Sequence, residues 1–577
     1  MLLDLDSTEG HRALEADICI AGAGAAGVTL ARALAAEGVE VLLLESGGRD
    51  FQNTAQDLAA GEVAAEGEPY YPLRESRLRF FGGTTAIWGG RVAELDPVDF
   101  EPRPGIANSG WPITHADLVP WYAAAHAALG LTRIASPAEG WRRLGRAEPP
   151  LDPGVLEPGF WQFDGEADRF TLPRAADLVA APNVTVVLNA TVTEIALQPG
   201  GRAVAGFDLR SPKGARATAR GRHFVLATGG IEAPRLVLAS RLSAGGDPAH
   251  GFGGEAVGRY FIEHPHARGG RLRPAAGWGA SWRALSLLPR HARHDGVRHA
   301  AVLRPSATVQ RREGILNSAL GLALRRPEGS GAGMARRGYA VLRHTLPSTG
   351  GWRRAWRLSR RAAATWRRLA DPVLSNLATT LGGREIALSI RAEQAPNPAS
   401  RVTLSPGTHD SLGVPLPVLD WRLSGIDRQS VQRLVALFGE ECARLDVGRV
   451  EPAAWLAPED GPWQFDPAIG NHALGGYHHM GTLRMGTDPQ QSVVDADCRF
   501  HDLANLHVAG SAVFPTGGWA NPTLTILALA LRLGARLAQL VGHERLDHRQ
   551  TAQPPEPRVA VAARRTDKGR QEAWSET

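Results

Sequence analysis

The sequence predicts an α/β fold that begins with a βαβ unit. Near the N-terminus, two apolar runs enclose a Gly-rich turn and a helix rich in Ala and Leu, and strand and helix patterns return at 183–240 and at 505–541. The length of 577 residues allows two to four domains or one large enzyme. Hydrophobic residues at 43% and charged residues at 21% exclude wholesale disorder and a fibrous protein.

The first unit consists of a short buried strand at 17–21, a helix at 28–37 and a second apolar strand at 39–44. Gly38 follows the helix, as expected at a helix C-terminus, and Glu45 closes the second strand. These elements have the length of one βαβ unit, about 30 residues.

The turn between the first strand and the helix carries the motif Gly22-x-Gly24-x-x-Gly27. Gly22 suits the tight turn, Gly24 lets the backbone approach a pyrophosphate, and Gly27 lets helix and strand pack closely. The helix N-terminus can donate N–H groups to phosphates, and Glu45 can accept hydrogen bonds from ribose hydroxyls. This context predicts a dinucleotide site, the alternative being a Gly-rich turn without a ligand. The motif alone does not separate FAD from NAD.

Charge and cysteine content exclude several classes of function. The formal charge of +5 is spread over a long chain whose basic residues are nearly all Arg, so no nucleic-acid partner is predicted. Cys19, Cys442 and Cys498 lie far apart without metal-ligand spacing, and no metal site is predicted. Residues 1–16 lack the features of a targeting signal, and no apolar run of about 18 residues predicts a membrane span. We therefore expect a cytoplasmic protein, with peripheral attachment to a membrane surface as an alternative.

The segment 81–90, Phe-Gly-Gly-Thr-Thr-Ala-Ile-Trp-Gly-Gly, resembles the flavin-contact loop of the glucose–methanol–choline (GMC) oxidoreductase family. Further segments resemble this family in the same order along the chain. They are Ser109–Pro112, Ala227–Gly230, Gly258–Pro265, Pro396–Val402, His478–Gly486 and Asn521–Thr525. Their order and spacing, over about 17–541, carry the resemblance.

The resemblance implies a Rossmann-like FAD-binding domain and a second α+β substrate domain built on an antiparallel sheet. The first and middle parts of the FAD-binding domain would take 16–269, with the flavin loop at 80–91. The substrate domain would take 270–475, and 476–545 would complete the FAD-binding domain and the catalytic site. The polar, charged composition of 546–577 predicts a disordered tail.

The Gly-Gly-Thr-Thr loop, Gly510 and the Asn-Pro-Thr-Leu-Thr segment make the chain most similar to the pyranose oxidase and fructose dehydrogenase branch. Besides the glycine motif and Glu45, the resemblance implies FAD contacts at Gly83, Thr84, Trp88, Gly510 and Pro522. Ile87 stands where pyranose oxidases carry a His that bonds covalently to the flavin. Because an isoleucine cannot form that bond, we expect non-covalent FAD.

The same resemblance implies a catalytic base at His478 and a group that orients the substrate oxygen at Asn521. Alcohol oxidation needs a base for the hydroxyl proton while the C–H hydrogen leaves as hydride to the flavin, and a neutral imidazole suits the first task. On an extended segment successive side chains alternate, so His479 is expected to face away from the flavin. A purely structural role remains the alternative for both, with Asn521 as a helix N-cap.

Two further features are given no catalytic role. His264 and His266 flank Pro265 and are expected to hold a turn. The stretch 334–370 contains many Arg and several Trp but no acidic residue. Three interpretations of this stretch remain open: a solvated insertion near the substrate entrance, an interfacial helix on an anionic membrane surface, and a docking face for a protein partner.

The predicted function is FAD-dependent oxidation of a CH–OH group to a carbonyl, with a sugar or glycoside as the favoured substrate. A dehydrogenase is favoured over an oxidase, and oxygen, a quinone and a cytochrome remain open as electron acceptors. The alternatives are a non-sugar alcohol or sterol as substrate, a non-redox enzyme that resembles hydroxynitrile lyases, and a flavin-binding protein without activity.

Overall fold

The computed structural model describes residues 1–7, 11–166, 168–245, 252–276, 292–325, 384–458, 461–466 and 472–552, with single residues at 284, 287, 355, 358, 359 and 469. Almost all of the basic stretch 334–370 and the part of the predicted tail after Ala552 lie outside the described residues.

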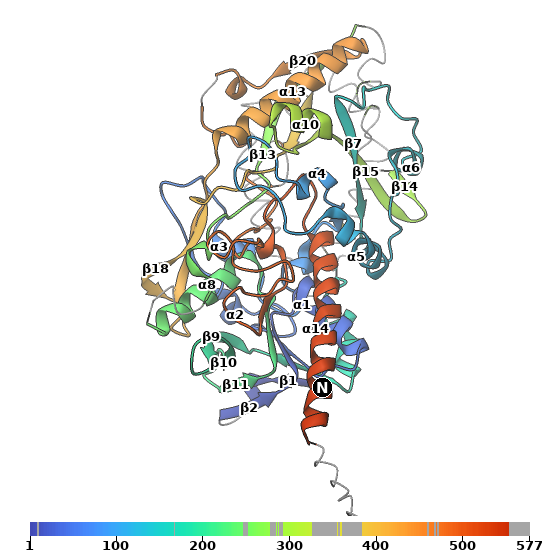
Figure 1. The fold of residues 1–577 in the computed structure, drawn as a ribbon. Coiled ribbons are helices and arrows are strands. Elements are labelled where there is room, and N and C mark those ends of the chain that lie inside the picture. Colours follow the sequence, from blue (N-terminus) through green and yellow to red (C-terminus); the bar gives the residue numbers. More distant parts are fainter. Residues whose placement is uncertain are drawn as a thin grey trace, which may run out of the picture.

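A parallel sheet with the strand order β1-β8-β4-β3-β12-β21 forms the centre of one half of the protein (Figure 1). Its strands are β1 (Leu2–Asp4), β8 (Val184–Leu188), β4 (Val41–Leu44), β3 (Ile18–Ala21), β12 (His223–Leu226) and β21 (Leu506–Val508). The predicted strands at 17–21 and 39–44 are confirmed, and β3 pairs with both β4 and β12. β1 lies within residues 1–16, and its Leu2 and Leu3 pair with Val186 and Val187 of β8.

Helix α1 (Ala25–Ala36) begins directly after the glycine turn and confirms the βαβ unit. Gly22 has φ +101°, a conformation that favours glycine. A Cβ there would also lie 2.7 Å from the carbonyl oxygen of Ala227. The first two turns of α1, Ala25–Ala31, are buried on all sides, so its N-terminus is enclosed at the end of β3.

The long C-terminal helix α14 (Thr523–Ala552) packs against α1 and α5 (His115–Ala128), as its position beside α1 in Figure 1 shows. Thr523–Leu546 is long and apolar enough to span a membrane, but 56% of its most apolar window is buried inside the protein. Its packing is that of a core helix. The helix continues to Ala552, past the predicted start of the tail.

A second, mainly antiparallel sheet has the order β20-β13-β17-β16-β15-β7-β6, with β14 paired to β15. Its strands are β20 (Gly448–Pro452), β13 (His266–Pro274), β17 (Glu385–Arg391), β16 (Ala319–Arg325), β15 (Val297–Pro305), β7 (Leu156–Phe163), β6 (Arg91–Val92) and β14 (Ala292–His294). Helix α13 (Gly425–Arg444) buries Val431, Leu434 and Phe438 against this sheet.

The substrate sheet is not confined to 270–475. β6 and β7 come from the range 16–269, and β7 joins the sheet by pairing along its whole length with β15. β13 likewise begins at His266. The chain therefore passes from one half to the other and back before the predicted boundary.

Two smaller sheets complete the strands, in the orders β2-β11-β10-β9 and β18-β19-β5. Their bounds are β2 (His11–Glu15), β11 (Arg216–Arg220), β10 (Val204–Arg210), β9 (Thr191–Leu197), β18 (Arg401–His409), β19 (Pro415–Asp420) and β5 (Glu62–Val63). Further helices are α8 (Gly229–Ser243), the 3-10 helix η2 (Gly83–Ile87), and the short α2 (Asn53–Asp57), α3 (Leu73–Ser76), α4 (Pro97–Phe100), α6 (Pro137–Arg143), α7 (Ala176–Ala180) and α10 (Ala307–Glu313).

Candidate active site

A cleft lies at the carboxyl ends of β3, β4, β12 and β21, beside the N-terminus of α1. Ligands in open α/β sheets bind at this edge of the sheet. Most of the residues predicted to contact the cofactor line this cleft: Gly22, Gly24, Glu45, Gly83, Thr84 and Gly510.

Gly27, Trp88 and Pro522 do not line the cleft. Gly27 has the predicted packing role, since a Cβ there would collide with the carbonyl oxygen of Gly22. Trp88 packs edge-on against Phe170, with ring centroids 6.3 Å apart. Pro522 is buried immediately before α14.

Glu45 is buried and fixed at the rim of the cleft. One carboxylate oxygen accepts a hydrogen bond from the N–H of Ala23 at 3.0 Å, and the other accepts from the N–H of Gly47 at 2.9 Å. Burial raises the pKa of Glu45, and these backbone donors oppose the shift. The carboxylate keeps lone pairs that can accept hydrogen bonds from ribose hydroxyls.

The residues that line the cleft fit FAD. At Gly24 a Cβ would meet no atom within 4 Å, so the backbone there is open to a bound pyrophosphate. Within the described part of the chain, the buried Oγ1 of Thr228 and Nε of Arg79 lack a hydrogen-bond partner, and both residues line the cleft. The cleft therefore offers spare polar atoms beside the N-terminus of α1.

An ion network that the sequence did not predict holds the segment just before the flavin loop against α8. Arg77 and Arg79 each contact the carboxylate of Glu232 at 2.5 Å, and Arg235 contacts Asp410 at 2.7 Å. Burial would raise the pKa of Glu232, but the three arginines hold it well below its usual range. All five side chains belong to residues that line the cleft.

His478 and Asn521, which lie 43 residues apart in sequence, are brought together. Nδ2 of Asn521 lies 3.1 Å from Nε2 of His478. Nδ1 of His478 lies 2.7 Å from Nδ1 of His264, whose Nε2 lies 2.8 Å from the carbonyl oxygen of Gly518. Burial lowers the pKa of both histidines, that of His478 well below its ordinary value, so both rings are neutral near pH 7.

The carboxylate of Glu263 lies behind this pair and holds the backbone of both histidines. It accepts hydrogen bonds from the backbone N–H of His264 at 2.8 Å and of His478 at 3.0 Å. It also accepts from the N–H of Gly476 at 3.0 Å and from the hydroxyl of Tyr70 at 2.6 Å. Glu263 therefore fixes where the two rings stand.

His479 has different neighbours from His478. Its ring lies 5.9 Å from that of Tyr70 and 6.0 Å from that of Phe261, and burial lowers its pKa to about 3. The segment is not a strand, since Tyr477 has φ +60°. The two imidazoles therefore have different surroundings. His479 belongs to the lining of the cleft and His478 does not, which differs from the expectation that His479 faces away from the flavin.

Sequence reasoning missed His264, which was expected to hold a turn and instead contacts the ring of His478. It also missed Glu263 and Tyr70. For Glu263 and His264 the only signal in the sequence was the Glu-His-Pro segment. The contact between His264 and His478 joins residues 214 positions apart, and such a contact leaves no trace in local spacing.

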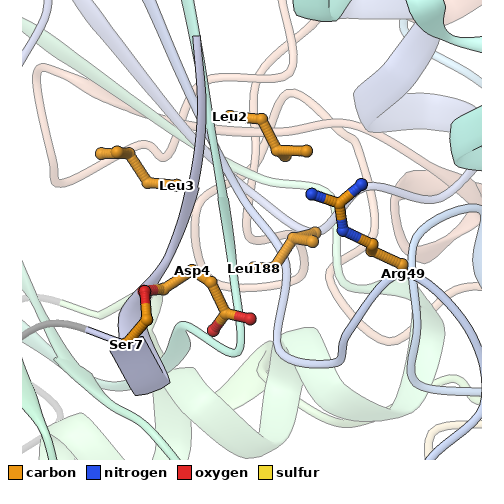
Figure 2. Close-up of a pocket in the computed structure, with 6 residues that line it drawn as sticks. All are labelled: Leu2, Leu3, Asp4, Ser7, Arg49 and Leu188. Carbon is orange, nitrogen blue, oxygen red and sulfur yellow. The ribbon is translucent and has the colours of Figure 1, made fainter.

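A second pocket, with a volume of about 260 Å³, lies at the edge strand β1. Figure 2 shows the residues that line it: Leu2, Leu3, Asp4, Ser7, Arg49 and Leu188. It shares no residue with the cleft. Among the described residues, no group of three His, Cys, Asp or Glu has the geometry of a metal site.

Comparison with known proteins identifies the family. Residues 17–251 match the FAD dependent oxidoreductase family, and residues 396–530 match the GMC oxidoreductase family. The first range contains most of the residues that line the cleft, and the second contains His478 and Asn521. The chain therefore carries an FAD oxidoreductase domain followed by a GMC oxidoreductase C-terminal domain. FAD is therefore its cofactor, and it acts on the CH–OH group of alcohols.

Curated relatives of this chain are named for different substrates. The chain is 27% identical to paromamine 6'-oxidase of Streptomyces fradiae, over 90% of this chain and 91% of that protein. It is 23% identical to 2-methyl-1,2-propanediol dehydrogenase of Mycolicibacterium austroafricanum, over 90% and 94%. It is 34% identical to the fructose dehydrogenase large subunit of Gluconobacter japonicus, over 24% of this chain and 23% of that protein.

Solved structures confirm the GMC fold. Pyridoxine 4-oxidase from Mesorbium loti aligns with a TM-score of 0.53 at 19% identity, over 92% of this chain and 99% of that chain. The predicted combination of an FAD-binding domain with a substrate domain on an antiparallel sheet is thus confirmed.

Proposed function

We propose that this GMC oxidoreductase oxidises a hydroxyl group of a sugar or glycoside to a carbonyl, with His478 as the base. The observation that carries the proposal is the pair formed by Nε2 of His478 and Nδ2 of Asn521, next to a residue that lines the FAD cleft. When bound, FAD supplies the hydride acceptor.

His478 is suited to take the hydroxyl proton. Its ring is neutral near pH 7 because burial lowers its pKa, and its position is fixed by Glu263 and His264. A positioned general base contributes about 10²–10⁴-fold, or roughly 3–5 kcal/mol of barrier.

Asn521 is suited to hold the substrate oxygen beside that base. Its amide nitrogen lies 3.1 Å from Nε2 of His478, so a substrate oxygen that lies beside the two nitrogens can contact both side chains. An amide donor that fixes the oxygen also fixes the direction of the C–H bond, which is the orientation that the reaction needs.

The substrate class is supported by relatives named for paromamine and for fructose, and the diol dehydrogenase supports a non-sugar alcohol. The test is an anaerobic screen of sugars, glycosides and simple alcohols that follows bleaching of the flavin absorbance. The proposal requires at least one sugar or glycoside to bleach the flavin faster than any simple alcohol. A screen in which only simple alcohols react would overturn the substrate class.

We propose in addition a dehydrogenase with non-covalent FAD. Ile87 lies in η2, in the flavin loop, and offers no nucleophile to the flavin. Acid denaturation followed by filtration should release yellow FAD into the filtrate, and flavin retained on the precipitated chain would contradict this. Reoxidation of the reduced protein should be faster with a quinone than with oxygen, and the reverse order would contradict a dehydrogenase.

A further inference from the structure

The side chains of Asn521, His478 and His264 form a hydrogen-bonded chain that ends on one backbone carbonyl. Nδ2 of Asn521 faces Nε2 of His478 at 3.1 Å, and Nδ1 of His478 faces Nδ1 of His264 at 2.7 Å. Nε2 of His264 faces the carbonyl oxygen of Gly518 at 2.8 Å. The two imidazole rings are nearly perpendicular, at 86°, with centroids 4.9 Å apart.

The proton positions along this chain follow from its end. A carbonyl oxygen can only accept, so Nε2 of His264 carries a proton and donates it to Gly518. His264 is neutral, so its Nδ1 has a lone pair and accepts. Nδ1 of His478 must then carry the proton between the rings, which leaves Nε2 of His478 without one.

The other end of this hydrogen-bonded chain, at Asn521, agrees with this assignment. The amide nitrogen of Asn521, rather than its oxygen, faces Nε2 of His478, which is the arrangement that a bare Nε2 requires. A bare Nε2 is the atom that a general base needs to accept a proton.

We propose that His264 is a positioning residue that holds His478 in the tautomer with a proton on Nδ1 and none on Nε2. This proposal rests on the proposed function of His478 as the base. Free histidine favours the other tautomer, so the protein must supply an acceptor at Nδ1, and His264 is that acceptor.

The carboxylate of Glu263 does not serve as this acceptor. It lies 4.0 Å from Nδ1 of His478, beyond hydrogen-bond distance. Its oxygens accept the backbone N–H groups of His264, Gly476 and His478 and the hydroxyl of Tyr70.

Gly518, whose carbonyl ends the hydrogen-bonded chain, is itself held in place. The N–H of Gly518 donates to Glu393 at 3.2 Å, and Glu393 is paired with Arg103 at 2.5 Å in a buried ion pair. Gly518 and Asn521 belong to one loop, which therefore contacts the imidazole pair at both ends.

The test uses two matched substitutions that separate the two nitrogens of His264. His264→Asn keeps an acceptor at the position of Nδ1, whereas His264→Gln keeps a donor at the position of Nε2 and loses that acceptor. His266→Gln is the control, because His266 bonds the carbonyl oxygen of His472 and not His478.

We expect His264→Gln to lower the rate constant of flavin reduction by about 10–100-fold, with little change in KM. His264→Asn should recover most of that loss, and His266→Gln should stay within about threefold of the wild type. Since tautomer populations do not depend on pH, the loss in His264→Gln should be constant above the pKa of His478. In His478→Ala, by contrast, the rate should rise with pH as substrate ionises.

Histidine-selective ¹⁵N NMR of the holoenzyme gives a readout without turnover. The imidazole signal that disappears in His478→Ala belongs to His478, and in the wild type it should show the proton on Nδ1. It should change in His264→Gln and persist in His264→Asn.

The outcomes separate the two proposals. A slow His478→Ala beside full rates for both His264 variants would leave the base in place and overturn the role of His264. A wild-type His478 signal with the proton on Nε2 would overturn it as well. A fast His478→Ala would remove the base itself, and with it the role of His264 in this reaction.

Discussion

Gly24 and Gly27 lie three residues apart in one turn, but their surroundings differ. At Gly24 the backbone has φ −79°, and a Cβ would meet open space. Gly24→Val should therefore fold almost normally and fail to retain FAD, because the side chain fills the path of the pyrophosphate. Flavin absorbance of the purified protein, with the apoprotein's far-UV circular dichroism, measures both effects.

Gly27→Val is the matched comparison. Here the Cβ would collide with the carbonyl oxygen of Gly22, so the packing of α1 on β3 must change. We expect poor yield of folded protein, whether FAD is added or not. A Gly24→Val protein that binds FAD normally would contradict the placement of the pyrophosphate.

The pH dependence of flavin reduction follows from the surroundings of His478. Burial lowers its pKa, and the nearby His264, His266, His479 and Arg391 lower it further when charged. The active form is the neutral ring, so the rate is retained above that pKa and lost as the pH falls through it. The rate should stay level from pH 8 to about 6.5 and fall only in more acidic buffer. A midpoint above about 6.5 would contradict this assignment.

At the scale of elements, α14 stabilises the FAD half by packing its apolar side on α1 and α5. Leu533 and Leu537 are almost fully buried, whereas Leu546 on the same helix is 55% exposed. Leu533→Ala should lower the free energy of unfolding by about 2–5 kcal/mol. Leu546→Ala should change it by less than about 0.5 kcal/mol, as judged from urea denaturation of the holoenzyme. Equal effects would show that α14 is not packed as described.

The elements also show where sequence reasoning succeeds. The βαβ unit was predicted because apolar runs, Gly22 and Gly38 each carry a local signal. β6 and β7 were not assigned to the substrate sheet, because their membership depends on pairing with β15, far along the chain. A short strand of mixed composition has no local feature that names its partner.

At the scale of the whole molecule, the FAD cleft joins segments from the beginning, middle and end of the chain. A ligand that binds only the folded chain stabilises it by mass action. Free FAD at about 100 times its Kd should add roughly 2.7 kcal/mol to the apoprotein. Thermal unfolding should therefore move to higher temperature as FAD is added, and Gly24→Val should show no such shift. A Tm independent of FAD in the wild-type apoprotein would contradict the assignment of the cleft.

The candidate site was partly predictable at this scale. The resemblance to GMC segments named His478 and Asn521, and the structure brings them into contact. It did not name His264, whose place beside His478 depends on how two distant loops pack. The arginines that surround Glu232 were missed for the same reason.

The central claim is that His478 removes the hydroxyl proton, and stopped-flow flavin reduction by a substrate from the anaerobic screen tests it most directly. His478→Ala should keep FAD and lower the rate constant by about 10²–10⁴-fold, with partial recovery at high pH. Asn521→Ala should be intermediate, and His479→Ala should cost about tenfold or less. A His478→Ala protein that reduces its flavin at nearly the wild-type rate, with or without a severe loss in His479→Ala, would contradict the account.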